Sequence, residues 1–169
     1  MSVLVLKLMR MCKTVICALL CVFLLAGCGS RSSVPSAHYE EVLSTLTASA
    51  KLNDTASYLK CFTPAAQSAY LSSGRYDPDL TEKLEHSEDG KEYLLTYTVL
   101  DHKELDSAGI ASLKLDYTEK YSQRIEIVKA YDLKIEFSSG SRSVTDKVTV
   151  LYNGSQWLIL GDVIESFFK

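Results

Sequence analysis

The feature that most constrains this chain is a charge-free apolar run that closes at the tetrapeptide LAGC (25–28). Residues 15–26 carry no charged side chain, and Lys7, Arg10 and Lys13 precede them. A run of twelve residues is too short to span a membrane, which takes ~20 residues. Behind a basic leader it suits the apolar part of a cleavable export signal instead. The globular part of the protein must therefore fold from the residues that follow.

An apolar residue, two small residues and then a cysteine resemble the lipobox of bacterial lipoprotein precursors. The resemblance implies cleavage between Gly27 and Cys28 and a diacylglyceryl group on Cys28. Two or three acyl chains on one residue make a stable membrane anchor, whereas a single chain binds only marginally. We therefore expect a signal peptide at 1–27, the lipidated cysteine and a short polar tether at 28–35, and one domain at 36–169 on the extracytoplasmic face of the cell membrane. The alternative is a short anchor that is not cleaved.

Loss of the leader changes the charge and the cysteine content of the exported part. Three basic residues leave with it, so the formal net charge goes from −3 to −6. An acidic domain is poorly suited to bind nucleic acid, and we expect no such partner. Three of the five cysteines also leave, and with Cys28 lipidated only Cys61 remains. This excludes an intramolecular disulfide or a cysteine metal cluster. Cys61 is expected in the core, the alternative being a reactive thiol.

Helical periodicity fills the first part of the domain, and strand alternation fills the second. Ser36 is a candidate N-cap for the first helix, and Thr63-Pro64 is typical of a helix start. The polar stretch 101–109 is expected to be mostly a loop. The predicted elements are helices at 36–50, 54–62 and 63–73, a weak helix at 79–86, a strand at 93–100, a helix at 105–121, and strands at 124–137, 144–152 and 157–163.

The predicted strand 124–137 is the longest, and its alternation indicates a sheet with one buried face. Asn153-Gly154 favours a two-residue type I′ hairpin turn between the last two strands, and Gly161 suggests a bulge. Helices packed on one face of a curved antiparallel sheet make an α+β domain. The buried face is predicted to carry Ile125, Ile127, Tyr131, Leu133, Ile135 and Phe137, and the solvated face Glu126, Asp132, Lys134 and Glu136.

The lipobox, the tether and this order of elements resemble bacterial lipoproteins of the nuclear transport factor 2-like superfamily. The resemblance implies a cone-shaped, cystatin-like α+β domain that often encloses a pocket, and dimers that pair through the sheet face. No catalytic motif of the superfamily is matched, so no functional residue carries over. The features that carry the resemblance are the helices at 36–73, YTVL (97–100), the helix before Tyr121, AYDLKIEF (130–137) and VLYNGSQWLI (150–159).

Polar residues that interrupt the apolar alternation are the candidates for chemistry. Lys129 interrupts one strand and Asp146 the next, and within one cavity they would pair or bind a polar ligand. The alternatives are a bulge that turns Lys129 outward and an exposed strand start at Asp146. Aromatic residues at alternate positions line a pocket or form plain core. The candidate pocket residues are Lys129, Asp146, Tyr97, Tyr131 and Trp157.

Other chemical motifs are weak. His102 stands among acids, which suggests a metal or an acid–base pair, but an acidic helix start explains the cluster without any function. We expect no metal and no cofactor, since no nucleophile elbow, phosphate loop or zinc helix motif occurs. Phe167 and Phe168 form an apolar C-terminal end, which either packs under a helix or contacts another chain.

Two functions remain open at this stage. The first is a non-enzymatic binding or interaction domain that holds a peptide, a cell-wall fragment or a second copy of the chain as a homodimer. The alternative is a pocket enzyme of the isomerase or dehydratase type that acts on a small hydrophobic molecule, with Lys129 and Asp146 as acid and base. A transporter-serving solute receptor is disfavoured by the 134 residues of the domain. A hollow core would favour ligand binding, and a filled core with an exposed sheet would favour a protein partner.

Overall fold

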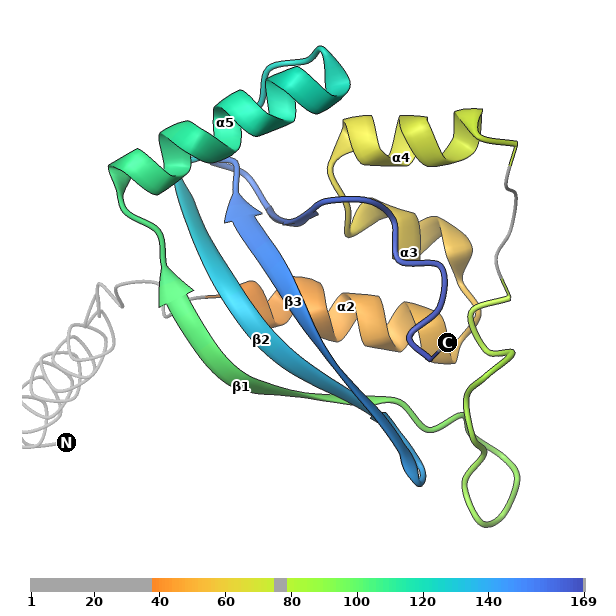
Figure 1. The fold of residues 1–169 in the computed structure, drawn as a ribbon. Coiled ribbons are helices and arrows are strands. Elements are labelled where there is room, and N and C mark those ends of the chain that lie inside the picture. Colours follow the sequence, from red (N-terminus) through yellow and green to blue (C-terminus); the bar gives the residue numbers. More distant parts are fainter. Residues whose placement is uncertain (1–37, 75–78, 169) are drawn as a thin grey trace, which may run out of the picture. The chain divides into compact units, whose positions relative to one another are not determined.

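The computed structural model describes residues 38–74 and 79–168. Figure 1 shows α2 crossing behind an antiparallel sheet, with α5 over one end of the strands. The strands pair in the order β1-β2-β3-β4, which confirms the α+β class. The lipobox, the tether and the Ser36 cap lie outside the described residues. The elements are α2 (Tyr39–Lys51), α3 (Thr55–Lys60), α4 (Pro64–Ser72), β1 (Thr96–Glu104), α5 (Ser107–Tyr121), β2 (Lys129–Ser139), β3 (Arg142–Tyr152) and β4 (Trp157–Leu160).

The main core lies between α2 and the sheet. Helical spacing places Leu43 and Leu46 on one stripe, and both side chains have no exposed surface. They pack in one cluster with Ile135 of β2 and Val150 of β3, which are equally buried. Complete burial of such a side chain stabilises the fold by about 1.5–3 kcal/mol. Apolar side chains therefore occupy the space between α2 and the inner face of the sheet.

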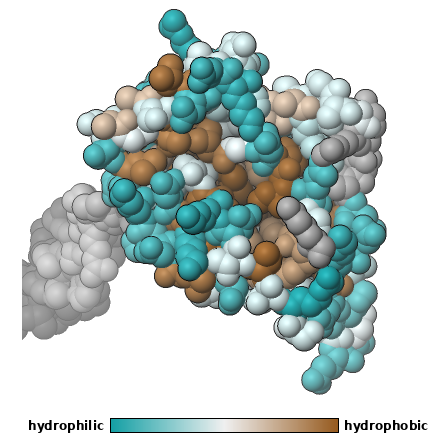
Figure 2. All heavy atoms as spheres, viewed as in Figure 1, coloured by the Kyte–Doolittle hydropathy of each residue, from teal (hydrophilic) through white to brown (hydrophobic). Residues whose placement is uncertain are grey.

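The outer face of the sheet, turned away from α2, is exposed to solvent over most of its length. On β2, Asp132 and Lys134 are exposed and Glu136 is half-buried, as the alternation predicts. At one end α5 covers this face, where Ala130, Leu151 and other buried residues form a second, smaller cluster. Figure 2 accordingly shows hydrophilic side chains over the strands and apolar side chains gathered below α5.

Two predictions about the middle of the chain are wrong. No helix forms at 79–86, where a turn is followed by an isolated bridge between His86 and Tyr93. β1 begins at Thr96 and continues through the polar stretch to Glu104, because β2 supplies a pairing partner along that whole length. Polarity predicts a loop only where no neighbouring strand is available, and here a neighbouring strand is present.

The strand ends also differ from the predictions. Residues 124–128 precede β2 instead of belonging to it, and β4 stops at Leu160, before Gly161 (φ +127°). The β3–β4 loop has four residues, 153–156, and is not a type I′ turn. That turn needs two residues with positive φ, whereas in this loop only Gly154 has one. The Asn153 side chain instead accepts hydrogen bonds from the backbone N–H groups of residues 155 and 156, at 3.0 Å each.

The C-terminal segment packs onto the helices. Phe167 and Phe168 are 7% and 5% exposed, so the first of the two alternatives for this end is confirmed. The fully buried Tyr58 of α3 donates its hydroxyl to the Ile164 carbonyl at 2.8 Å. Cys61 is buried as predicted, and burial raises the pKa of its thiol to about 11. A thiol that stays protonated in the core is a poor nucleophile.

The first prediction concerns the Tyr58 hydroxyl. Tyr58→Phe keeps the ring and leaves the Ile164 carbonyl without its donor, so we expect a loss of about 1–2 kcal/mol in the free energy of unfolding. Urea denaturation followed by circular dichroism measures it. Tyr117→Phe is the matched control, because Tyr117 is also buried and its hydroxyl makes no hydrogen bond to the described residues. Equal losses in both variants would contradict the prediction.

The second prediction concerns the β2–β3 turn. Gly140 has φ +56°, and a Cβ there would overlap the Glu85 carboxylate, which accepts hydrogen bonds from the backbone N–H and the hydroxyl of Ser141. Gly90 has φ +69° with open space around it. Gly90→Ala should therefore cost about 1 kcal/mol from backbone strain alone, and Gly140→Ala about 1 kcal/mol more from the displaced carboxylate.

Urea denaturation of the two glycine variants gives this difference directly. In a Glu85→Ala background the carboxylate is absent and only the Cβ of residue 85, 3.1 Å from the new methyl group, remains, so most of the extra cost of Gly140→Ala over Gly90→Ala should disappear. If the full extra cost persists in that background, the displaced carboxylate is not its cause.

Candidate functional site

Five rings meet at the end of the sheet where α2 begins. Tyr39 of α2 lies 5.2 Å from Tyr131 and 6.2 Å from His102, measured between ring centres. Trp157 lies 5.9 Å from Tyr131 and 5.4 Å from Tyr152. These separations fall in the range of favourable aromatic pairs. We call the five residues the aromatic cluster.

Strand register explains why distant residues converge there. Lys129 pairs with Tyr152, and Tyr152 pairs with Trp157, so these three side chains form one row across the end of the inner face. Tyr131 pairs with Glu104 in the next row of the same face. Tyr39 and Tyr131 are 5% and 4% exposed, whereas Tyr152 and Trp157 are half-buried. The cluster therefore has a buried base and an open rim.

An ion pair stands on this rim. The Lys129 ammonium lies 3.3 Å from a Glu104 carboxylate oxygen, and the Tyr131 hydroxyl donates to the other oxygen at 3.0 Å. The nearby Tyr131 hydroxyl, more than the Glu104 carboxylate, raises the pKa of Lys129. The side chains of Lys129 and Glu104 are 36% and 55% exposed, so solvent screening keeps the pair's contribution to stability small. Its main effect is to hold three polar groups together beside the rings.

Of the five candidate pocket residues, the structure brings three together. Lys129, Tyr131 and Trp157 all belong to the rim or base of the cluster. Tyr97 makes no ring contact with the cluster; its hydroxyl lies 3.0 Å from the Ser44 hydroxyl and donates to the Glu40 carbonyl at 3.3 Å. Asp146 is exposed and pairs with Ile135, six positions along β2 from Lys129, or roughly 20 Å at ~3.3 Å per residue. Lys129 and Asp146 therefore do not meet as an acid–base pair.

Sequence reasoning missed Tyr39 and Glu104 as members of this site. Tyr39 occupies an ordinary core position of the predicted amphipathic helix, and Glu104 lies in a stretch predicted to be a loop. Only the pairing of β1 with β2 shows that Glu104 faces Tyr131. The length of β2 could have indicated that Glu104 lies in a strand. A strand of eleven residues offers pairing positions beyond residue 100, where the neighbouring strand is predicted to end.

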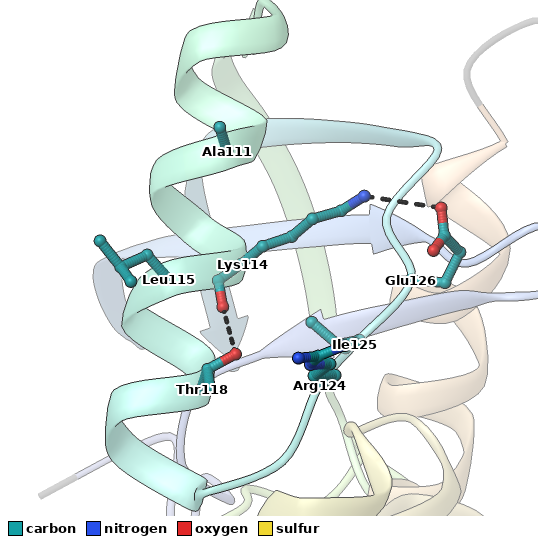
Figure 3. A pocket seen from close by; sticks show the side chains of 7 residues that line it. All are labelled: Ala111, Lys114, Leu115, Thr118, Arg124, Ile125 and Glu126. Carbon is teal, nitrogen blue, oxygen red and sulfur yellow. Dashed lines mark hydrogen bonds and ion pairs between the residues drawn. The ribbon is translucent and has the colours of Figure 1, made fainter.

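The structure also has a shallow depression away from the cluster, between α5 and residues 124–126. It has a volume of about 510 Å³, and Figure 3 shows Lys114 reaching across it toward Glu126, 3.5 Å away. Arg124 adds a second cation to its lining. None of the candidate pocket residues lines this depression.

Metal chemistry finds no support in the described part of the chain. Within residues 38–74 and 79–168, no group of three or more His, Cys, Asp or Glu side chains is placed to hold an ion. His102, the residue that suggested a metal or an acid–base pair, contacts the rings of Tyr39 and Tyr131 instead.

The hydroxyl of Tyr39 has a raised pKa because of burial and the nearby Glu40.

The third prediction tests the hydrogen bonds on the rim. Tyr131→Phe removes the hydroxyl that is the largest cause of the raised pKa of Lys129, so the pKa of the Lys129 ammonium should fall back toward its ordinary value. NMR titration of the lysine Nζ signals measures this change. Lys120 is the control, because its raised pKa comes mainly from Asp162, 2.8 Å away, and should not move. An unchanged Lys129, or equal shifts in both lysines, would disprove the assignment.

Comparison with known proteins does not assign the chain to a family. No family model, no curated protein and no solved structure matches the chain. Among the described residues, no helix has both the length and the apolarity needed to cross a membrane. The function must therefore be inferred from the aromatic cluster, the exposed sheet and the residues that precede the domain.

Proposed function

We propose that this protein is a membrane-anchored lipoprotein of the extracytoplasmic face whose domain is a non-enzymatic interaction module. The basic leader, the apolar run and the LAGC tetrapeptide (25–28) support the anchor, with Cys28 as the acylated residue. The order of elements supports the resemblance to the nuclear transport factor 2-like cone. Helices α2–α4 precede the sheet, α5 separates β1 from β2, and β2, β3 and β4 follow in sequence.

The free edge of β1 is the observation that favours an interaction module. β1 pairs only with β2 among the described strands, so one edge of a nine-residue strand is open. The backbone N–H and C=O groups of such an edge add a strand from an extended peptide. The space between α2 and the sheet is filled by apolar side chains, which favours a surface contact over an enclosed ligand.

The pairing-competent part of this edge is its first half. A register shift between Val99 and Asp101 interrupts the ladder, and Asp101, Lys103 and Glu104 follow as charged, exposed residues. Bulges and charges are the features by which proteins block unwanted strand pairing. Thr96–Val99 lacks both, so a partner segment of about four residues fits there. We assign the partner to an extended segment of another protein.

The fourth prediction tests the anchor and the edge separately. Cys28→Ser should abolish labelling by a lipid precursor and release the protein from the membrane fraction. Cys61→Ser should keep both properties, because Cys61 is buried in the domain. A lipid-labelled, membrane-bound Cys28→Ser protein would overturn the lipoprotein assignment.

For the edge, a photo-crosslinking amino acid is placed at Thr98 of β1 or at Lys147 of β3 in the lipidated protein. Both positions are exposed and lie on the outer face, but only Thr98 belongs to the free edge. We expect a discrete crosslinked species from Thr98 and a much weaker one from Lys147. Equal products would indicate binding to the sheet face, and a product of twice the protein's own mass would indicate a second copy; either result contradicts the proposed partner.

A further inference from the structure

The end of the domain where α2 begins carries both exposed and half-buried apolar groups. Val128 is 58% exposed, and its backbone N–H donates to the Tyr152 carbonyl at 2.8 Å. The rings of Tyr152 and Trp157 are half-buried and in contact. A Cβ added at Gly154 would lie 3.7 Å from the Val128 side chain, which places the β3–β4 loop beside it. We call Val128, Tyr152 and Trp157 the apolar end.

The lysine next to the apolar end is paired with a carboxylate. The Lys129 ammonium contacts the Glu104 carboxylate and lies 5.1 Å from the centre of the Tyr131 ring. Long lysine side chains lie along apolar surface while their ammonium group reaches toward polar surroundings. A surface of two amphipathic rings, an exposed aliphatic side chain and one lysine is typical of proteins at a lipid–water interface.

This end is also where the chain leaves the described structure toward the anchor. Tyr39, the first residue of α2, is itself in contact with Trp157, with ring centres 6.4 Å apart. In Figure 1 the start of α2 lies on the left, on the same side as the end of β1, and the β2–β3 hairpin points away from it. Cys28 precedes Tyr39 by eleven residues, which span at most roughly 40 Å at ~3.6 Å per residue.

We propose that the apolar end lies in the head-group interface of the membrane that holds the anchor, with Tyr152 and Trp157 as interfacial side chains. This proposal rests on the lipidation of Cys28. A contact of three side chains is weak by itself, but a short tether keeps it at high effective concentration next to the bilayer. The exported part is acidic, so the contact depends on ring and aliphatic burial and needs no anionic lipid.

A second copy of the chain is the competing occupant of this surface. Copies that pair through the apolar end would protect Trp157 in proportion to their density in the membrane, whereas a lipid contact protects it at any density. The chain contains one tryptophan, so native fluorescence reports on this end alone.

The fifth prediction uses the full lipidated protein in phosphatidylcholine vesicles. Lipids brominated near the head groups should quench the emission of Trp157, and lipids brominated deep in the acyl chains should quench it less. Acrylamide quenching from the aqueous side should fall relative to the unlipidated Cys28→Ser protein. These results should not change when the protein-to-lipid ratio is lowered, and protection that disappears on dilution in the membrane would assign the surface to a second copy and overturn the proposal.

Two variants make the test specific. Val128→Glu places a charge on the apolar end and should abolish bromolipid quenching while the protein stays bound through its lipid. Leu52→Glu is the matched control, because Leu52 is 78% exposed but follows the last residue of α2, roughly 20 Å from Tyr39 at ~1.5 Å per residue. Quenching should persist in that variant.

The outcomes separate this inference from the function on which it rests. A protein that carries no lipid and does not bind vesicles overturns both proposals. A lipidated, vesicle-bound protein whose Trp157 emission is the same with and without bromine overturns only the membrane contact and leaves the anchor intact.

Discussion

The packing of one helix on one face of the sheet determines most of this structure. Leu43 and Leu46 of α2 and Ile135 and Val150 of the sheet have no exposed surface, so the part of the inner face beneath α2 belongs to the core. α2 covers the inner face only as far as Tyr39, where the aromatic cluster opens to solvent. On the outer face only α5, among the described elements, covers the strands, at one end, and elsewhere most side chains on that face are charged or carry hydroxyl groups.

The alternation of β2 and the spacing of α2 were predictable because both are local patterns with one dominant cause. A repeat of two or of 3.6 residues places the apolar side chains on one face of a strand or helix, and burial of that face then fixes its orientation toward the core. The charged stretch that ends β1 was not predictable in this way. Its strand conformation depends on backbone pairing with β2, which its own side chains do not encode. The same reason explains why Glu104 was not connected with Tyr131.

Turn chemistry failed for a different physical reason. Asn153-Gly154 favours a tight hairpin, but Asn153 also accepts backbone hydrogen bonds through its side chain, and that alternative gives the wider loop observed. The pairing of Tyr152 with Trp157 is retained, so the aromatic row forms with either turn. Lys129 and Asp146 illustrate the limit of parity arguments: both lie on the inner face, yet parity contains no information about distance along a strand. Register supplies that distance, and it separates them.

The two proposed contacts constrain one another through the direction of the strands. β1 ends, and β2 begins, at the end of the sheet that carries Trp157, so a domain resting on lipid at that end has its strands pointing toward the bilayer. Antiparallel pairing of two β1 edges about a two-fold axis reverses the strand direction. One Trp157 of such a pair would point away from the membrane. Lipid contact and symmetric edge pairing therefore exclude each other for copies in one membrane, which leaves Thr96–Val99 to a segment of a different chain.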